Sequence, residues 1–278
     1  MNEEVLQQMG SVIMETAKRL KSHFRVFEIN TSKPGYNGKK DKTCETAANK
    51  ILNWIEDELN EEILYLPKKI VVEYFDMAAS IDSQSANGLI VKFDSEGVFS
   101  SRENVEKDQA KIQALPVVIV RNKGGEILRL RRRERDENNA LHEKIVIWAG
   151  GHVRKEDNQN GLAIKNCAIR ELQEELRLRV EPDQLNLLGA VYSDISAGTS
   201  KHVALVYEWR AETDDVSIAL SNSEFFERRG NSLSGTFVSA DSLGKMLEKK
   251  NLTEEWSSQI IRNLLPDTAG SISPGLFD

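Results

Sequence analysis

The chain has 278 residues, of which 44 are acidic and 37 basic, for a formal net charge of −7. This charge argues against general affinity for nucleic acid, although it allows nucleotides bound through a metal ion. The two cysteines, Cys44 and Cys167, lie far apart without metal-ligand spacing, which argues against a disulfide scaffold and for a reducing compartment. No apolar run approaches a membrane span and no signal-peptide pattern is present, so we expect a cytoplasmic protein without a membrane partner.

Residues 1–110 predict a small α+β domain whose role the sequence leaves open. Amphipathic patterns predict helices and apolar runs predict strands, the helices at 5–20 and 44–59 and the strands at 69–75 and 88–93. Residues 94–109 are rich in Ser, Glu, Asp and Lys, which is typical of a connector. We therefore expect a domain boundary near residue 110.

Residues 111–266 carry the patterns of a larger domain, and residues 267–278 those of a mobile tail. A strand at 115–120 leads through Asn122-Lys123-Gly124-Gly125, which is typical of a hairpin turn, into a return strand at 126–130. Later patterns predict strands at 144–148, 185–191, 202–209 and 236–238, and helices at 240–249 and 253–264. The last two helices have Asp241 and Thr253 as candidate N-caps.

The most informative segment is residues 144–178. An apolar strand ends in Ala149-Gly150-Gly151, where the backbone must turn sharply or approach a ligand closely. After a loop, a helix places Glu171, Glu174 and Glu175 on one arc, beside an apolar arc. Carboxylates three or four residues apart repel one another, and a hard divalent cation would turn that repulsion into binding. A solvated acidic helix face is the alternative interpretation.

This segment resembles the box of the Nudix hydrolases, G-x5-E-x7-R-E-U-x-E-E-x-G-U, in which U is aliphatic. Gly151 matches the first glycine, and Arg170-Glu171-Leu172, Glu174-Glu175 and Leu178 match the core of the motif. Three departures are visible: Asp157 replaces the first glutamate, the spacing from Asp157 to Arg170 is five residues too long, and Arg177 replaces the last glycine. The GGHV…D pattern is also similar to a subgroup of predicted Nudix phosphoesterases.

The resemblance implies a fold, a cofactor and a reaction. The fold is an α/β/α sandwich with a mixed sheet. The cofactor is Mg²⁺ or Mn²⁺, held by Glu171, Glu174, Glu175 and the carbonyl of Gly151. The reaction is hydrolysis of a phosphoanhydride in a nucleoside diphosphate-linked substrate or a related pyrophosphate. Asp157 either orients the ligands through the box arginine or has no role.

The resemblance also implies a set of catalytic candidates, namely Glu174, Glu171, Arg170 and Glu224. A carboxylate must accept the proton of the attacking water, and either Glu174 or Glu224 fits that role. Glu224 lies with Glu227 in a polar loop, and Nudix enzymes often recruit a general base from such a loop. A solvated loop glutamate is the alternative for Glu224.

Substrate-binding candidates come from an arginine series and from a histidine. The alternating residues Arg129, Arg131, Arg133 and Arg135 would share one face of a strand. We prefer Arg131 and Arg133 as phosphate ligands, since guanidinium groups fork onto phosphate oxygens, although a charged, solvated strand end is equally compatible. His152 follows the double glycine and is the third candidate, with a local hydrogen bond as its alternative. His202 alternates with apolar residues, which predicts a core histidine.

Two other classes of function remain open at this level. Asp157 and the insertion modestly favour a catalytically inactive box, in a nucleotide sensor that signals through the N-terminal domain. The N-terminal domain is alternatively an interaction module for which the rest of the chain is a scaffold. The sequence does not identify the substrate, and it leaves a homodimer open.

Overall fold

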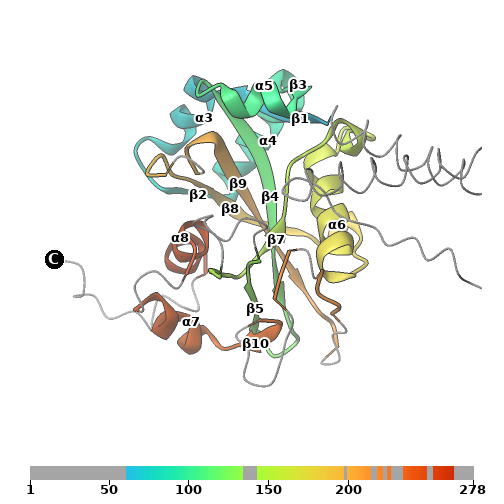
Figure 1. The fold of residues 1–278 in the computed structure, drawn as a ribbon, viewed down its shortest axis with the longest axis vertical. Coiled ribbons are helices and arrows are strands. Elements are labelled where there is room, and N and C mark those ends of the chain that lie inside the picture. Colours follow the sequence, from blue (N-terminus) through green and yellow to red (C-terminus); the bar gives the residue numbers. More distant parts are fainter. Residues whose placement is uncertain are drawn as a thin grey trace, which may run out of the picture. The chain divides into compact units, whose positions relative to one another are not determined.

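The structure is a computed structural model that describes residues 61–133, 143–196, 199–213, 218–221, 224–226, 234–248 and 253–265. A mixed sheet runs through it in the order β10-β5-β4-β9-β8-β2 (Figure 1). These strands are β10 Thr236–Val238, β5 Ile127–Arg131, β4 Lys111–Arg121, β9 His202–Arg210, β8 Asn186–Tyr192 and β2 Ser80–Asp82. Strands β4 and β9 pair in parallel and the other neighbours pair antiparallel, which confirms the expected α/β class with a mixed sheet.

Short strands join the central strands of this sheet. They are β1 Glu62–Pro67, which pairs with β4 and with β3 Val98–Ser101, β6 Ile145–Val146, which pairs with β5, and β7 Ala149–Gly150, which pairs with β4. Every residue of β4 after Lys111 is buried, as expected for a strand that is covered on both faces. The double glycine therefore begins inside the sheet, where Gly150 pairs with Val117 of this buried strand.

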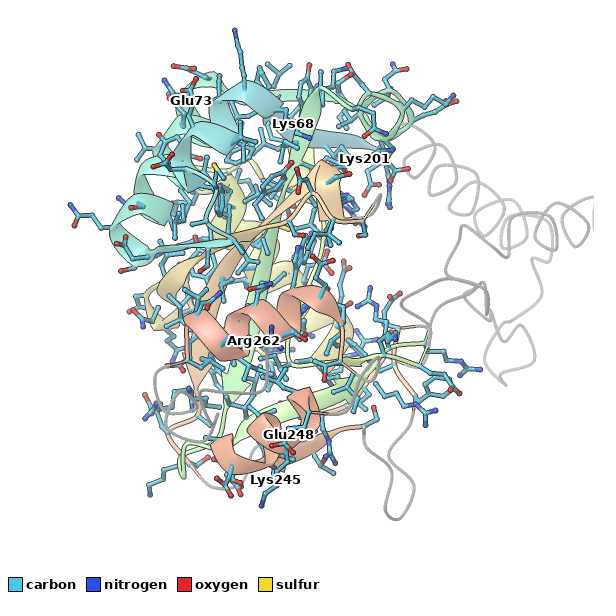
Figure 2. All side chains as sticks on the ribbon, turned by 90° about the vertical axis from the view of Figure 1, so that its left-hand side faces the viewer. Lys68, Glu73, Lys201, Lys245, Glu248 and Arg262 are labelled. Carbon is cyan, nitrogen blue, oxygen red and sulfur yellow. The ribbon has the colours of Figure 1, made fainter. Side chains whose placement is uncertain are left out.

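Helices cover both sides of the sheet. On one side, α6 Ala163–Leu176 contacts β4 and β7; on the other, α4 Ser83–Glu96 and α8 Glu255–Asn263 contact β8 and β2 (Figure 1). Figure 2 views this second side, where α8 carries Arg262 and α7 Ala240–Leu247 carries the exposed Lys245. None of the helices in the described part of the chain has the length and apolarity needed to cross a bilayer.

Two predicted strands are wrong, because residues 69–75 and 88–93 lie in helices. They belong to α3 Lys68–Phe75 and to α4. The buried residues of α4 are Ala86, Leu89 and Phe93, a spacing of three and four that fits one helix face. Asp82 caps α4 by accepting a hydrogen bond from the amide of Ser85 at 2.8 Å. The β-branched and aromatic residues of these segments favoured strands locally, and packing overrides that preference.

The expected connector at residues 94–109 is also wrong, since it contains β3 and the helix α5 Arg102–Lys107. Its charged residues pair along the exposed side of α5, with Arg102 bonding Glu106 and Lys107 bonding Glu103. The described residues from Glu62 onward belong to one compact unit. The boundary expected near residue 110 thus falls inside one compact unit. The helices expected at 5–20 and 44–59 and the tail at 267–278 lie outside the described residues.

The expected N-caps of the last two helices lie one or two residues away from the observed ones. Ser239 caps α7 through the amide of Ser242. Glu254 caps α8, and its carboxylate accepts from the amides of Trp256 at 2.7 Å and Ser257 at 2.9 Å. The Glu254 carboxylate thus occupies the free amides of the first turn, and Thr253 is not the cap.

Candidate active site

The acidic helix α6 buries two of its three predicted ligands. Glu171 and Glu175 are 5% and 2% exposed, whereas the side chain of Glu174 is 28% exposed. Cys167, Leu172 and other apolar residues of the same helix pack into the core. Glu171 and Glu175 therefore do not lie on a solvated face of the helix. Carboxylates buried to this degree require partners, because burial of an unpaired charge is costly.

The double glycine supplies backbone contacts to both buried carboxylates. The amide of Gly150 donates to Oε2 of Glu175 at 3.0 Å. A Cβ at Gly151 would lie 2.5 Å from Oε1 of Glu171, so that carboxylate rests directly against the glycine backbone. A Cβ at Gly150 would lie 2.2 Å from the carbonyl oxygen of Pro116 in β4. Gly150 needs glycine because a Cβ there would meet the backbone of β4, whereas a Cβ at Gly151 would push the Glu171 carboxylate out of its place.

Arg170 ties the helix to the loop that precedes it. Its Nε and Nη2 donate to the two carboxylate oxygens of Asp157 at 2.9 and 3.0 Å, a bidentate pair. Its Nη1 donates to Glu171 at 2.6 Å and to Glu174 at 3.4 Å. The extra residues after Asp157 form a turn in which Asn160 and Gly161 have positive φ, and Asn166 holds that turn through the carbonyl of Asp157. Asp157 is thus joined to the arginine despite the insertion.

We expect Asp157→Ala to destabilise the fold by about 3 kcal/mol, because it leaves the guanidinium of Arg170 buried without its main partner. Urea unfolding measures the change. Asp157→Glu is the matched control, since it keeps the charge and adds one methylene, and it should retain most of the stability. Equal losses in the two variants would contradict an ion-pair role for Asp157.

A second arginine, Arg132, approaches the acidic helix from the end of β5. Its Nη1 lies 3.4 Å from Oε1 of Glu175, and its Nη2 lies 3.3 Å from Oε2 of Glu224. The segment that carries Glu224 is fixed on the helix, because the amide of Ser221 donates to the carbonyl of Glu175 at 2.8 Å. The segment of Glu224 therefore lies beside the acidic helix, and Arg132 contacts an acid of each.

Comparison with known proteins identifies the family. Residues 111–262, more than half of the chain, match the model of the NUDIX domain. The chain belongs to the Nudix family. Tm1382, a predicted Nudix hydrolase, is similar over 73% of this chain and 100% of its own, with 20% identity and a TM-score of 0.54, so the likeness is one of fold. A MutT protein from Methanosarcina mazei Go1 is 21% identical over 55% of this chain and 92% of its own, with a TM-score of 0.39. No functionally curated protein matches the chain.

The last departure from the Nudix box has a structural explanation. Arg177, which stands where the motif has glycine, ends α6 in the left-handed conformation with φ of 60°. The amide of Leu178 donates to the carbonyl of Leu172 at 3.2 Å, which closes the helix end as a glycine cap would. The Nudix helix therefore ends in the usual way, with a residue that is less suited to this conformation.

Arg177→Gly should stabilise the fold by about 0.5–1 kcal/mol, because glycine adopts the left-handed conformation without the steric cost of a Cβ. Chemical denaturation measures the gain. Arg177→Ala is the control, since it removes the charged end and keeps the Cβ, and it should bring no gain. A stability gain of the same size in both variants would mean that charge, not backbone conformation, is responsible.

The Nudix carboxylates have the chemistry of a site for a hard divalent cation, and Nudix hydrolases generally use divalent metals. Burial raises the pKa of Glu171, and burial with the charges of Glu171 and Glu224 raises the pKa of Glu175 to about 8, against the opposing charge of Arg132. A cation would offset that cost. In the part of the chain that the structure describes, no three His, Cys, Asp or Glu side chains converge as a ligand set. Arginines contact all three carboxylates, Arg170 bonding Glu171 and Glu174 and Arg132 bonding Glu175.

The predicted substrate-binding arginines lie on the other side of the strand end from Arg132. Arg131 pairs with Glu143 at 2.9 Å, and its guanidinium lies 5.0 Å from the ring centroid of Phe226, while Arg133 lies 5.7 Å from the same ring. Sequence reasoning missed Arg132 because the alternating pattern drew attention to its neighbours. The same alternation could have identified Arg132, because it places this side chain on the opposite face of the strand, towards the core. Arg135 and Glu227 lie outside the described residues.

The predicted histidines contact each other. Nε2 of His152 lies 3.3 Å from Nε2 of His202, and the ring of His202 meets that of Trp256 edge-on with centroids 6.3 Å apart. Burial lowers the pKa of His152 well below its usual range, and the charge of Arg102 adds to the effect. The carbonyl of His152 accepts from Arg170 at 3.0 Å, so its backbone belongs to the arginine network of the site.

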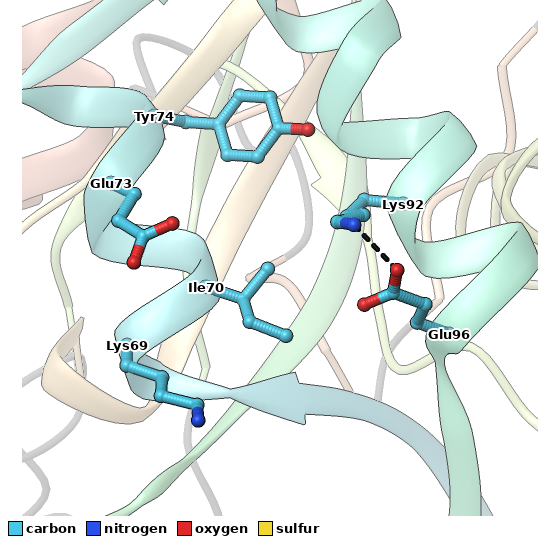
Figure 3. Close-up of a pocket in the computed structure, with 6 residues that line it drawn as sticks. All are labelled: Lys69, Ile70, Glu73, Tyr74, Lys92 and Glu96. Carbon is cyan, nitrogen blue, oxygen red and sulfur yellow. Dashed lines mark hydrogen bonds and ion pairs between the residues drawn. The ribbon is translucent and has the colours of Figure 1, made fainter.

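A groove of about 500 Å³ lies elsewhere, between α3 and α4 (Figure 3). It is lined by Lys69, Ile70, Glu73, Tyr74, Lys92 and Glu96. Lys92 and Glu96 pair along α4, which forms one wall, and Tyr74 from α3 donates to the carbonyl of Gly88 at 3.2 Å. The groove is open and its charges are mixed, and it shares no residue with the acidic helix, so it is a feature separate from the site.

Proposed function

We propose that the protein is a divalent-metal-dependent hydrolase that cleaves a phosphoanhydride in a nucleoside diphosphate-linked substrate or a related pyrophosphate. The observation that carries the proposal is the burial of Glu171 and Glu175 against the glycine bend of a Nudix box. Buried carboxylates whose pKa is raised are an expensive arrangement for stability alone, and they are typical of functional sites.

The metal ligands in this proposal are Glu171, Glu174, Glu175 and the carbonyl of Gly151. When bound, Mg²⁺ or Mn²⁺ would neutralise the diphosphate and make water a better nucleophile. Glu174, as the most exposed of the three acids, is the one that faces an incoming substrate. Asp157 holds the guanidinium of Arg170, and Arg170 donates to Glu171. The pair therefore keeps the Glu171 carboxylate oriented.

We assign the role of general base to Glu224 rather than to Glu174. Glu224 comes from a separate segment, its side chain is 19% exposed, and it stands beside Glu175 through Arg132. In the reaction, the Glu224 carboxylate accepts a proton from the attacking water as the new P–O bond forms, and the bond to the leaving phosphate oxygen breaks. Such proton transfer contributes roughly 10²–10⁴-fold in rate.

The test is a hydrolysis screen with Mg²⁺ or Mn²⁺ over ADP-ribose, UDP-glucose, diadenosine tetraphosphate and dGTP. We expect metal-dependent turnover of at least one class, abolished by EDTA and restored by added metal. Ligand-induced thermal stabilisation without product release would instead select the inactive nucleotide sensor. That alternative rests on Asp157 and the insertion, whereas the bidentate Asp157–Arg170 pair supports the hydrolase.

A further inference from the structure

We propose that Arg132 is a positioning residue that holds the general base Glu224 against the acidic helix; this inference rests on the proposed function. The two terminal nitrogens of one guanidinium face two acids from different elements, Glu175 at 3.4 Å and Glu224 at 3.3 Å. A planar fork is suited to this double contact, whereas the ammonium of a lysine is a single point charge.

Two aromatic rings pack against this guanidinium. Its central carbon lies 5.7 Å from the ring centroid of Trp148 and 5.5 Å from that of Phe225. The backbone is fixed as well, since the amide of Arg132 donates to the carbonyl of Lys144 at 2.8 Å. With only 16% of its side chain exposed, Arg132 has little freedom to leave the two carboxylates.

The supporting ring is itself held by the last helix. Nε1 of Trp148 donates to Oε2 of Glu254 at 3.2 Å, and Glu254 is 4% exposed at the start of α8. The hydroxyl of Ser257 accepts from the amide of Ile147 at 3.3 Å. A chain of contacts therefore runs from Glu254 through Trp148 to Arg132, and from there to both acids.

The backbone of Glu224 is held by hydrogen bonds, so only its side-chain rotamer is left for Arg132 to determine. Its carbonyl accepts from the amide of Arg133 at 2.7 Å, and the amide of Phe226 donates to the carbonyl of Arg131 at 3.0 Å. Arg132 is bridged to Phe225 in the same register. The guanidinium then selects the rotamer of Glu224 that points to Glu175, which is the geometry a base beside the acidic helix requires.

The test is a double-mutant cycle of Arg132→Met and Glu224→Gln, assayed with whichever of ADP-ribose, UDP-glucose, diadenosine tetraphosphate and dGTP the wild type hydrolyses fastest. Methionine keeps the apolar length and removes the fork. We expect Arg132→Met to lower kcat about 10–100-fold with KM changed less than about threefold, and the double variant to be no slower than Glu224→Gln, because residues that act as a unit are non-additive. Arg132→Lys should restore only part of the activity.

Arg210→Met is the matched control, since Arg210 is an exposed arginine at the end of β9, and kcat should not change. If Arg132→Met does not fold, Trp148→Phe replaces it, which keeps a ring and removes the bond to Glu254; it should lower kcat about 3–10-fold with the same non-additivity. Additive effects, or an effect on KM alone, would overturn the role of Arg132. A wild type that hydrolyses none of the four probes with either metal would instead overturn the proposed function.

Discussion

Glu174→Gln should lower kcat by more than the roughly 10–100-fold that loss of an outer-shell partner costs a metal site, while the protein stays folded. Glutamine keeps the shape of the side chain and removes the negative charge that a hard cation needs. The fold should tolerate the change because Glu174 is the most exposed of the three acids, and its contact with Arg170 is long at 3.4 Å. Steady-state kinetics and thermal unfolding on the same preparation separate the two effects.

The metal concentration that the same variant needs is a second measurement of the role of Glu174. If Glu174 is a ligand, Glu174→Gln should need a higher concentration of Mg²⁺ or Mn²⁺ for half-maximal rate. Glu181→Gln is the control, since Glu181 is an exposed glutamate beyond the end of α6, and both its activity and its metal dependence should match the wild type. Retained activity in Glu174→Gln would remove Glu174 from the ligand set and leave Glu171 and Glu175 to explain the site.

The sequence predicted the elements whose signals are local and strong. The predicted strand at 236–238 coincides with β10, and the turn at Asn122 has Gly125 in a left-handed conformation, as a hairpin turn requires. The acidic helix was recognisable because charge and apolarity repeat with helical spacing and follow a double glycine. These features depend on residues a few positions apart, which a single sequence displays directly.

The sequence did not predict features that arise from contacts between distant segments. Helices α3 and α4 contain β-branched and aromatic runs, and only their packing against β1 and β8 shows the helical spacing of buried residues. The double contact of Arg132 depends on the fold, which brings the end of β5 next to the segment of Glu224. Likewise, the sequence left the role of Asp157 undecided, and the fold joins it to Arg170 by two hydrogen bonds.

The two glycines of the bend should respond differently to the same substitution. In Gly150→Ala, the new methyl group would lie 2.2 Å from the carbonyl oxygen of Pro116, which belongs to the central strand and cannot move freely. We expect a loss of about 2–3 kcal/mol in the free energy of unfolding, as for overpacking of a core. In Gly151→Ala, the methyl would lie 2.5 Å from Oε1 of Glu171, the movable end of a side chain.

Gly151→Ala should therefore keep most of its stability and lose activity, because displacing a metal ligand by about 1 Å is enough to cost roughly 10²-fold in rate. Urea unfolding and kcat measured on both variants give a crossed result, with Gly150→Ala the less stable and Gly151→Ala impaired mainly in kcat. The two variants can be compared directly because the glycines are adjacent, and the added methyl group meets a strand backbone in one and a carboxylate in the other. If Gly151→Ala kept the wild-type kcat, Glu171 would not need its place against the bend, and its assignment as a ligand would fail.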